Sequence, residues 1–195
     1  MSTHPDLWFC ARDERSYTFL KKNFSNNVLL VPDMAFAIKP ATLKRNLPTN
    51  PAGDVFVKRT DHELVDGDRY ERYFTALDVE PETRDWPTLE KRYWSHKWLE
   101  RHLRKKKYPE WLVNLFAATL FRREMIRAGV DFLGSYRTIY TTRLHAAILG
   151  VLLGRPVRMF DNNYGKNSTF YATWLANMSG VEMILEAPAR EFVTE

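Results

Sequence analysis

The sequence predicts one α/β domain across residues 1–195, built on a largely parallel sheet that is flanked by helices. Short apolar segments alternate with helical segments along the chain, which is the order typical of parallel sheets. The chain is 45% apolar and 14% aromatic, which is enough for one well-buried core. Its single cysteine, Cys10, excludes an internal disulfide framework and a cysteine-based zinc cluster.

Five segments have the apolar and β-branched character of buried strands. They are residues 6–11, 27–33, 54–59, 138–142 and 155–163. Three prolines between positions 40 and 51 place a loop between the second and third of these strands.

Helices are predicted between the strands from periodicity and from residues that begin or end a helix. Residues 13–24 carry acids in the first turn and lysines in the last, which suits the helix dipole. The stretch from Trp86 to Gly129 is predicted to be mostly helical, with a second helix that starts after Pro109 and ends at Gly129. A further helix, residues 143–154, ends at its last glycine.

The net charge of +5 is unevenly spread, because residues 91–107 carry eight bases and one acid. Such a basic block can bind nucleic acid, anionic lipid or an acidic polymer. The alternative is a solvated helix with Tyr93, Trp94, Trp98 and Leu103 on its buried side. No zinc-finger, RNA-recognition or helix-turn-helix signature accompanies the block, so we expect no nucleic-acid partner.

No segment approaches the roughly 20 apolar residues that span a bilayer, and the first residues lack the pattern of a secretory signal. We therefore expect a soluble cytoplasmic protein, with the inner face of the membrane as an alternative location. No histidine–carboxylate spacing of the metalloprotease kind occurs, so no metal site is predicted.

Polar and charged residues end or follow each of the five predicted strands. They are Arg12 and Asp13, then Asp33, then Arg59, Asp61 and Glu63, then Arg143 and His145, and finally the residues from Asp161 to Asn167. The carboxyl ends of parallel strands share one edge of a sheet, so these side chains should converge. Arg12, Arg143 and Lys166 beside a helix amino terminus would form an anion site. A histidine at that place, His145, could transfer a proton near neutral pH.

Each of these residues also has an interpretation without a function. Arg143 could be a surface ion-pair partner, and His145 a half-buried histidine with satisfied hydrogen bonds. Arg12 and Asp13 could begin a helix, and Asp33 could be a turn residue after proline. The last segment could be no more than a turn, because asparagine and glycine favour left-handed backbone.

Five sequence blocks stand at these strand ends. They are ARDERS, VPDMAF, RTDHE, TTRLHAAILGVLLGRPV and DNNYGKNSTFYATW, and they span residues 11–174. In this order they resemble the carboxyl-terminal part of the polysaccharide pyruvyl transferases, and the last block is the most specific. The resemblance implies a Rossmann-like second lobe of a glycosyltransferase-B-like fold, with the amino-terminal lobe absent from this chain.

The resemblance also implies an activity. Phosphoenolpyruvate would donate a pyruvyl group to hydroxyls of a sugar in a bacterial exopolysaccharide or cell-wall glycan, giving a pyruvate ketal and phosphate. The donor would be a substrate, and no cofactor is expected. The acceptor would be a sugar or a lipid-linked oligosaccharide, and a separate amino-terminal lobe and a peripheral contact with the membrane would be further partners.

By the same resemblance, Arg12 and Arg143 would clamp the phosphate and carboxylate of the donor. Leu144 would contribute its backbone amide or its packing, His145 would be the general acid, and Asp161 would be a second catalytic group. The remaining substrate-binding residues would be Asp13, Asp33, Arg59, Asp61, Glu63, Asn162, Tyr164, Gly165, Lys166 and Asn167.

Two other functions stand as alternatives. One is a nucleotide-sugar glycosyltransferase-like domain, which would share the architecture but bind a sugar nucleotide. The other is a degenerate, non-catalytic module that binds an anionic glycan through residues 91–107, whose basic residues are densest at positions 104–107.

Overall fold

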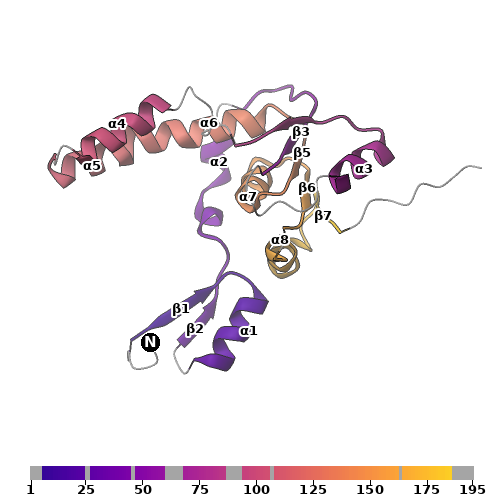
Figure 1. Ribbon diagram of the computed structural model, residues 1–195, viewed down its shortest axis with the longest axis horizontal. Helices are drawn as coiled ribbons and strands as arrows, with labels where there is room; N and C mark the ends of the chain where they lie inside the picture. The colour runs from indigo at the N-terminus through magenta and orange to yellow at the C-terminus, as the bar shows by residue number, and fades with distance from the viewer. Residues whose placement is uncertain are drawn as a thin grey trace, which may run out of the picture.

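The computed structural model of the chain describes residues 6–24, 27–44, 47–59, 68–86, 94–105, 108–162 and 164–185. These residues form two sheets, and the strands within each sheet are parallel (Figure 1). The smaller sheet pairs β1 (Trp8–Ala11) with β2 (Asn27–Leu30). The larger sheet has the order β4 (Glu82–Arg84), β3 (Asp54–Val57), β5 (Thr138–Thr141), β6 (Val157–Phe160) and β7 (Val181–Ile184). The predicted α/β class with parallel strands is confirmed.

The five predicted strands do not share one sheet, which corrects the expectation that their ends line a single edge. Among the described residues, β1 and β2 pair only with each other. They are joined by α1 (Glu14–Asn23), a crossover helix that returns the chain to lie parallel to its starting strand. The 3₁₀ turn η1 (Met34–Ala37) and the short α2 (Pro40–Leu43) then lead to the larger sheet.

Two strands of the larger sheet were not predicted. β4 consists of three polar residues, Glu82, Thr83 and Arg84, so it has no alternating apolar pattern to mark it. It pairs with β3 at one edge of the sheet. β7 pairs with β6 at the other edge and follows Gly180, whose φ is +80°.

The start of α1 shows why the chain turns into a helix there. Asp13 Oδ1 accepts the backbone N–H of Ser16 at 2.8 Å, and Asp13 Oδ2 accepts its hydroxyl at 2.9 Å. Lys21 and Lys22 lie in the last turn, as predicted from the helix dipole. Asp13 therefore caps α1.

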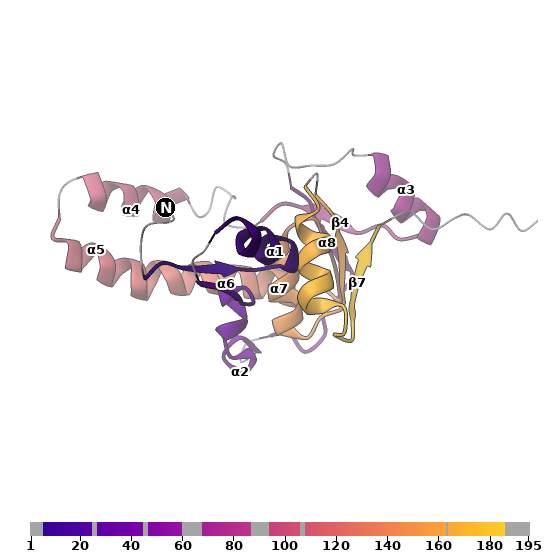
Figure 2. The same ribbon diagram turned by 90° about the horizontal axis from the view of Figure 1, so that it is seen from below.

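Side chains of the larger sheet alternate between two apolar layers, and Figure 2 shows α7 (Leu144–Leu153) and α3 (Asp68–Leu77) on opposite sides of that sheet. In the aromatic layer, Phe56 and Phe160 contact Tyr70 and Tyr73 of α3, with the Phe56 and Tyr70 ring centroids 5.2 Å apart. The layer beneath α7 is aliphatic, and its strand residues are Val55, Val57, Ile139, Val157 and Met159. Gly154 ends α7 with φ +73°, as predicted.

A helical arm extends from the larger sheet (Figure 1). It consists of α4 (Trp94–Lys105) and a continuous helix made of α5 (Glu110–Phe116), the π-helical turn η5 (Ala117–Phe121) and α6 (Arg122–Gly134). Pro109 precedes this helix as predicted, but the predicted end at Gly129 is wrong. Gly129 instead makes room for Trp86, because a Cβ there would lie 2.9 Å from the indole ring. Position 129 therefore requires glycine because the Trp86 ring approaches the backbone there, and not because the helix ends.

Much of the basic block lies on α4. Trp98 is 62% exposed and stacks on His102 with ring centroids 4.9 Å apart, so the expected burial of Trp98 is wrong. Residues 91–93 and 106–107 of the block lie outside the described residues. None of the described helices is long and apolar enough to cross a membrane.

The two sheets meet at a set of contacts that we call the joint. In it, Arg12 and Phe36 contact α8 (Lys166–Phe170) and the π-helical turn η6 (Tyr171–Leu175). Trp174 Nε1 donates to the carbonyl oxygen of Arg12 at 2.8 Å. Phe36 of η1 stacks on Phe170, with ring centroids 6.4 Å apart and the ring planes 8° from parallel. The joint places the end of β1 beside the carboxyl edge of the larger sheet.

Candidate active site

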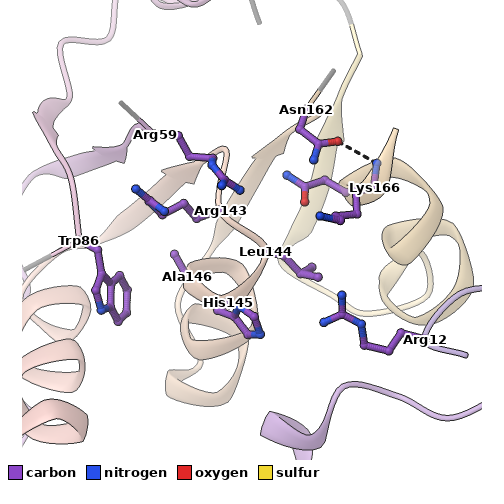
Figure 3. Close-up of a pocket in the computed structure, with 10 residues that line it drawn as sticks. Arg12, Arg59, Trp86, Arg143, Leu144, His145, Ala146, Asn162 and Lys166 are labelled. Atoms are coloured by element: carbon purple, nitrogen blue, oxygen red, sulfur yellow. Dashed lines mark hydrogen bonds between the residues drawn. The ribbon is translucent and has the colours of Figure 1, made fainter. Parts of the chain in front are cut away.

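A pocket of about 270 Å³ lies at the carboxyl ends of β3, β5 and β6, beside the start of α7 (Figure 3). Four arginine and lysine side chains and one histidine contribute to its lining, and none of the described lining residues is a carboxylate. The lining residues are Arg12, Arg59, Trp86, Arg143, Leu144, His145, Ala146, Asn162, Lys166 and Asn167. The joint thus brings Arg12 from the smaller sheet to the strand ends of the larger one.

Arg143 is the residue before α7, and its turn is fixed by Thr141. Thr141 Oγ1 accepts the backbone N–H of Arg143 at 2.9 Å, and the Arg143 backbone is extended at φ −104° and ψ 118°. The guanidinium is held by Asp85, whose Oδ1 lies 2.8 Å from Nε and 2.6 Å from Nη2. Asp85 Oδ1 also accepts the backbone N–H of Trp86 at 2.7 Å. Arg143 is therefore oriented by the protein itself.

The first backbone amides of α7 belong to Leu144, His145 and Ala146, which all line the pocket. The preceding residue, Arg143, has no acceptor on its side chain and gives these amides no cap. Unpaired amides and the helix dipole favour an anion at this place.

Asp33 connects Arg12 and His145 across the joint. Its Oδ2 lies 2.7 Å from Arg12 Nη1 and 3.4 Å from His145 Nε2, and its Oδ1 accepts the backbone N–H of Ala35 at 3.0 Å. Burial raises the pKa of Asp33, but the Ala35 amide, Arg12 and His145 lower it more, so the pKa lies below its ordinary value. Asp33 is therefore a carboxylate at neutral pH. The His145 side chain is 71% exposed, so a ligand can reach it.

Lys166 enters the pocket from the turn after β6. Gly165, with φ +70°, allows the chain to reverse there before α8 begins. Asn162 Oδ1 accepts the backbone N–H of Lys166 at 2.8 Å (Figure 3). No described carboxylate forms an ion pair with Lys166, so its charge is available to a ligand.

Asn167 holds the two loops of the pocket together. Its side chain is buried, and Nδ2 donates to the carbonyl oxygens of Thr142 at 3.0 Å and Phe160 at 2.8 Å. Thr142 directly precedes Arg143, and Phe160 ends β6. One amide group thus fixes the spacing between the turn that carries Arg143 and the loop that carries Lys166.

Asp161, which was predicted to be catalytic, makes structural contacts. Its Oδ1 accepts the backbone N–H groups of Asn162 at 2.9 Å and of Asn167 and Ser168 at 3.2 Å each. These bonds satisfy amides at the start of α8. Asp161 does not line the pocket.

The other predicted residues fall into two groups. Asp61 and Glu63 lie outside the described residues. The predicted substrate-binding residues that are described but do not line the pocket are Asp13, Asp33, Tyr164 and Gly165, of which Asp33 contacts two lining side chains.

Sequence reasoning did not identify Asp85, Trp86 and Thr142 as parts of the site. Thr142 Oγ1 accepts the backbone N–H of Arg59 at 3.1 Å and so joins the ends of β3 and β5. Asp85 follows a strand too short and polar to be recognised, so nothing in the sequence placed it at a strand end. Among the described residues, no group of three or more histidine, cysteine or acidic side chains could hold a metal ion.

The fold and the pocket define the chain as an α/β domain with a cationic pocket at the ends of its parallel strands. The chain belongs to the polysaccharide pyruvyl transferase family, whose sequence model matches residues 1–164. The resemblance identified from the sequence blocks is confirmed. Because the match ends at Tyr164, most of the last block, residues 161–174, lies beyond it.

Individual relatives agree with this assignment. The chain is 26% identical over 198 residues to EpsO of Bacillus subtilis, assigned by name to the pyruvyl transferases, covering 97% of this chain and 57% of the relative. It is 28% identical over 194 residues to pyruvyl transferase 1 of Schizosaccharomyces pombe, covering 94% and 44%. It is also 26% identical over 193 residues to general stress protein 30 of Bacillus subtilis, covering 91% and 45%. The chain thus spans about half the length of the curated relatives it matches.

The fold matches a crystal structure of a functionally uncharacterized protein from Klebsiella pneumoniae. The TM-score is 0.56 at 25% sequence identity, and the match covers 90% of this chain and 54% of the other. The arrangement of the described elements therefore occurs in a solved structure.

Proposed function

We propose that the protein transfers a pyruvyl group from phosphoenolpyruvate to hydroxyls of a sugar in a bacterial exopolysaccharide or cell-wall glycan. The product would be a pyruvate ketal, with phosphate as the leaving group. The observation that carries this proposal is the gathering of Arg12, Arg143, Lys166 and His145 in one pocket of a chain from this family.

The charges in the pocket suit this donor. Phosphoenolpyruvate carries a phosphate and a carboxylate on a three-carbon skeleton, so it needs cations on two sides. Arg143 lies beside the first amides of α7, and Arg12 approaches from the smaller sheet. Lys166 adds a third cation. Guanidinium groups bind carboxylate and phosphate through paired hydrogen bonds, and Asp85 and Asp33 orient the two arginines for this.

The reaction requires proton transfers that His145 can perform. Protonation of the methylene carbon makes the neighbouring carbon electrophilic, and an acceptor hydroxyl then adds to that carbon. Phosphate departs, a second hydroxyl takes its place, and each attacking hydroxyl loses a proton. We assign His145 as the acid that protonates the methylene carbon, with Asp33 holding its imidazole from 3.4 Å. Cations around the departing phosphate stabilise its developing charge.

Asp161 is assigned a positioning role in this proposal. Its Oδ1 already accepts three backbone N–H groups, which hold the start of α8 and hence Lys166 in place. Asp161 does not line the pocket, so it is assigned no contact with the acceptor hydroxyl.

The first experiment is calorimetric titration of the purified chain with phosphoenolpyruvate and, separately, with inorganic phosphate. We expect tighter binding of phosphoenolpyruvate, because its carboxylate engages a second cation. Arg143→Ala should weaken binding about 10- to 100-fold, the value of a hydrogen-bonded charged contact. Arg127→Ala is the matched control, because Arg127 is 63% exposed and pairs with Asp131 on α6 outside the pocket.

Equal affinities for the two ligands, or an unchanged affinity in Arg143→Ala, would contradict the donor assignment. A sugar nucleotide that binds where phosphoenolpyruvate does not would support the glycosyltransferase alternative. Circular dichroism of each variant shows that the folded state is retained.

A second experiment separates the role of His145 from binding. His145→Gln should bind phosphoenolpyruvate with little change, because the cations remain. Phosphate release in the presence of an acceptor should fall about 100- to 10,000-fold, which is the usual contribution of a positioned acid. Phosphate release at the wild-type rate would remove His145 from the mechanism.

A further inference from the structure

A second hollow, which also has Lys166 in its lining, lies between α1 and the turn that starts α8. It is a groove of about 870 Å³. Its lining includes Asp13, Arg15, Ser16, Phe19, Tyr164 and Lys166. Phe19 is 60% exposed and Tyr164 is 64% exposed, and no described aromatic ring packs against either one. Two large aromatic surfaces from distant parts of the chain therefore face solvent in one groove.

The walls of the groove are fixed relative to each other. Arg15 Nη1 donates to the carbonyl oxygen of Tyr164 at 3.4 Å. Next to it, the backbone N–H of Glu14 donates to Thr173 Oγ1 at 3.2 Å. These bonds join α1 to the loop after β6 and to η6, so the two walls of the groove are held together by hydrogen bonds.

The groove adjoins the cationic pocket, because Lys166 lines both. A ligand in the groove would therefore lie next to an anion held by Arg12 and Arg143. His145 lines the cationic pocket and not the groove. This is the arrangement that a reaction between two substrates needs.

The lining chemistry fits a pyranose. One face of a sugar ring presents C–H groups, which pack on the electron-rich face of an aromatic ring, while its rim presents hydroxyls. The groove offers aromatic rings on Phe19 and Tyr164 for the C–H face. It also offers the charged groups of Arg15 and Lys166, which can donate hydrogen bonds to the hydroxyls of the sugar. A purely apolar ligand would cover the Lys166 ammonium group without pairing its charge.

We propose that this groove holds the acceptor sugar, with Phe19 and Tyr164 packed against the C–H face of its pyranose ring. This inference rests on the proposed function, because it takes the anion in the neighbouring pocket to be the pyruvyl donor. It assigns Phe19 and Tyr164 to acceptor specificity and leaves donor binding to the pocket.

The test is saturation-transfer NMR on the chain with saturating phosphoenolpyruvate and methyl β-D-galactopyranoside or methyl β-D-glucopyranoside as probe. We expect saturation of at least one probe. Tyr164→Ala and Phe19→Ala should each weaken its binding about 3- to 10-fold, the value of one aromatic contact. Tyr164→Phe should bind nearly as well as wild type, because it keeps the ring. Tyr108→Ala is the matched control, since Tyr108 is 43% exposed and lies between the two helices of the arm.

Calorimetry with phosphoenolpyruvate on the same variants separates the two proposals. If the donor binds but neither probe receives saturation, or if Tyr164→Ala and Phe19→Ala bind a probe like wild type, the acceptor groove is refuted while the donor site stands. If the donor itself does not bind, the proposed function fails first. An equal loss of probe binding in Tyr108→Ala would also overturn the groove.

Discussion

Replacing Asn167 by alanine tests whether one buried amide holds the pocket together. Asn167 is 2% exposed, and its Nδ2 donates to the carbonyl oxygens of Thr142 and Phe160 at 3.0 Å and 2.8 Å. Alanine removes both bonds and leaves two buried carbonyl groups without this donor. At about 1–3 kcal/mol for each such group, the free energy of unfolding should fall by roughly 2–6 kcal/mol.

Thermal unfolding followed by circular dichroism measures this loss. For a chain of this size the expected fall in Tm is roughly 4–24 °C. Asn23→Ala is the matched control, because Asn23 is exposed and its Nδ2 donates to the carbonyl oxygen of Phe19 at 2.7 Å. That control should stay within about 0.5 kcal/mol of wild type.

Phosphoenolpyruvate affinity gives a second measurement for the same variant. The turn before Arg143 and the loop before Lys166 lose their common anchor, so we expect weaker donor binding by Asn167→Ala at a temperature where it remains folded. A variant that unfolds like wild type and binds the donor equally well would refute the assigned role of Asn167.

Three further changes test the fold and the site. Gly150→Ala would place a Cβ 2.8 Å from Val157 Cγ2 and 2.9 Å from Ile139 Cδ1, so urea unfolding should show a loss of about 1–3 kcal/mol. Gly165→Ala would put a Cβ on a residue with φ +70°, and a loss of about 1–2 kcal/mol is expected; an unchanged urea midpoint would show that the turn relaxes. The folded pKa of Asp33 is lowered, so its carboxylate stabilises the protein above the unfolded pKa, and this stability is lost as pH falls through the folded pKa. The pH–stability profile of Asp33→Asn should therefore be flatter than that of wild type below about pH 4, and parallel acid limbs would contradict the ion-pair geometry.

The central part of the fold was predictable because its residues satisfy local rules. β5, α7 and β6 combine apolar strands with a helix that ends at Gly154, and nothing in the packing overrides those preferences. The same is true of Arg143 and His145, which follow a recognisable strand. Position after a strand was enough to place both side chains in the pocket.

Other features depend on contacts that local sequence does not encode. β1 and β2 resemble inner strands of one large sheet, but among the described residues they pair only with each other, and their own composition does not show which strands pair. The roles of Asp33 and Asp161 could not be separated either, since both follow strands. Asp161 accepts three backbone amides, whereas Asp33 lies beside Arg12 and His145, and only the folded chain shows the difference.

The position of Asp33 and Arg12 on one side of the joint, and of His145 on the other, has a thermodynamic consequence. Any separation of the two sheets would take both charged groups away from the imidazole and open the pocket. A doubly charged ligand that touches both sides binds more tightly when the sheets are docked. By reciprocity, it must strengthen their docking by the same free energy. The gain in ligand affinity when the sheets dock and the gain in docking when the ligand binds are therefore the same coupling free energy.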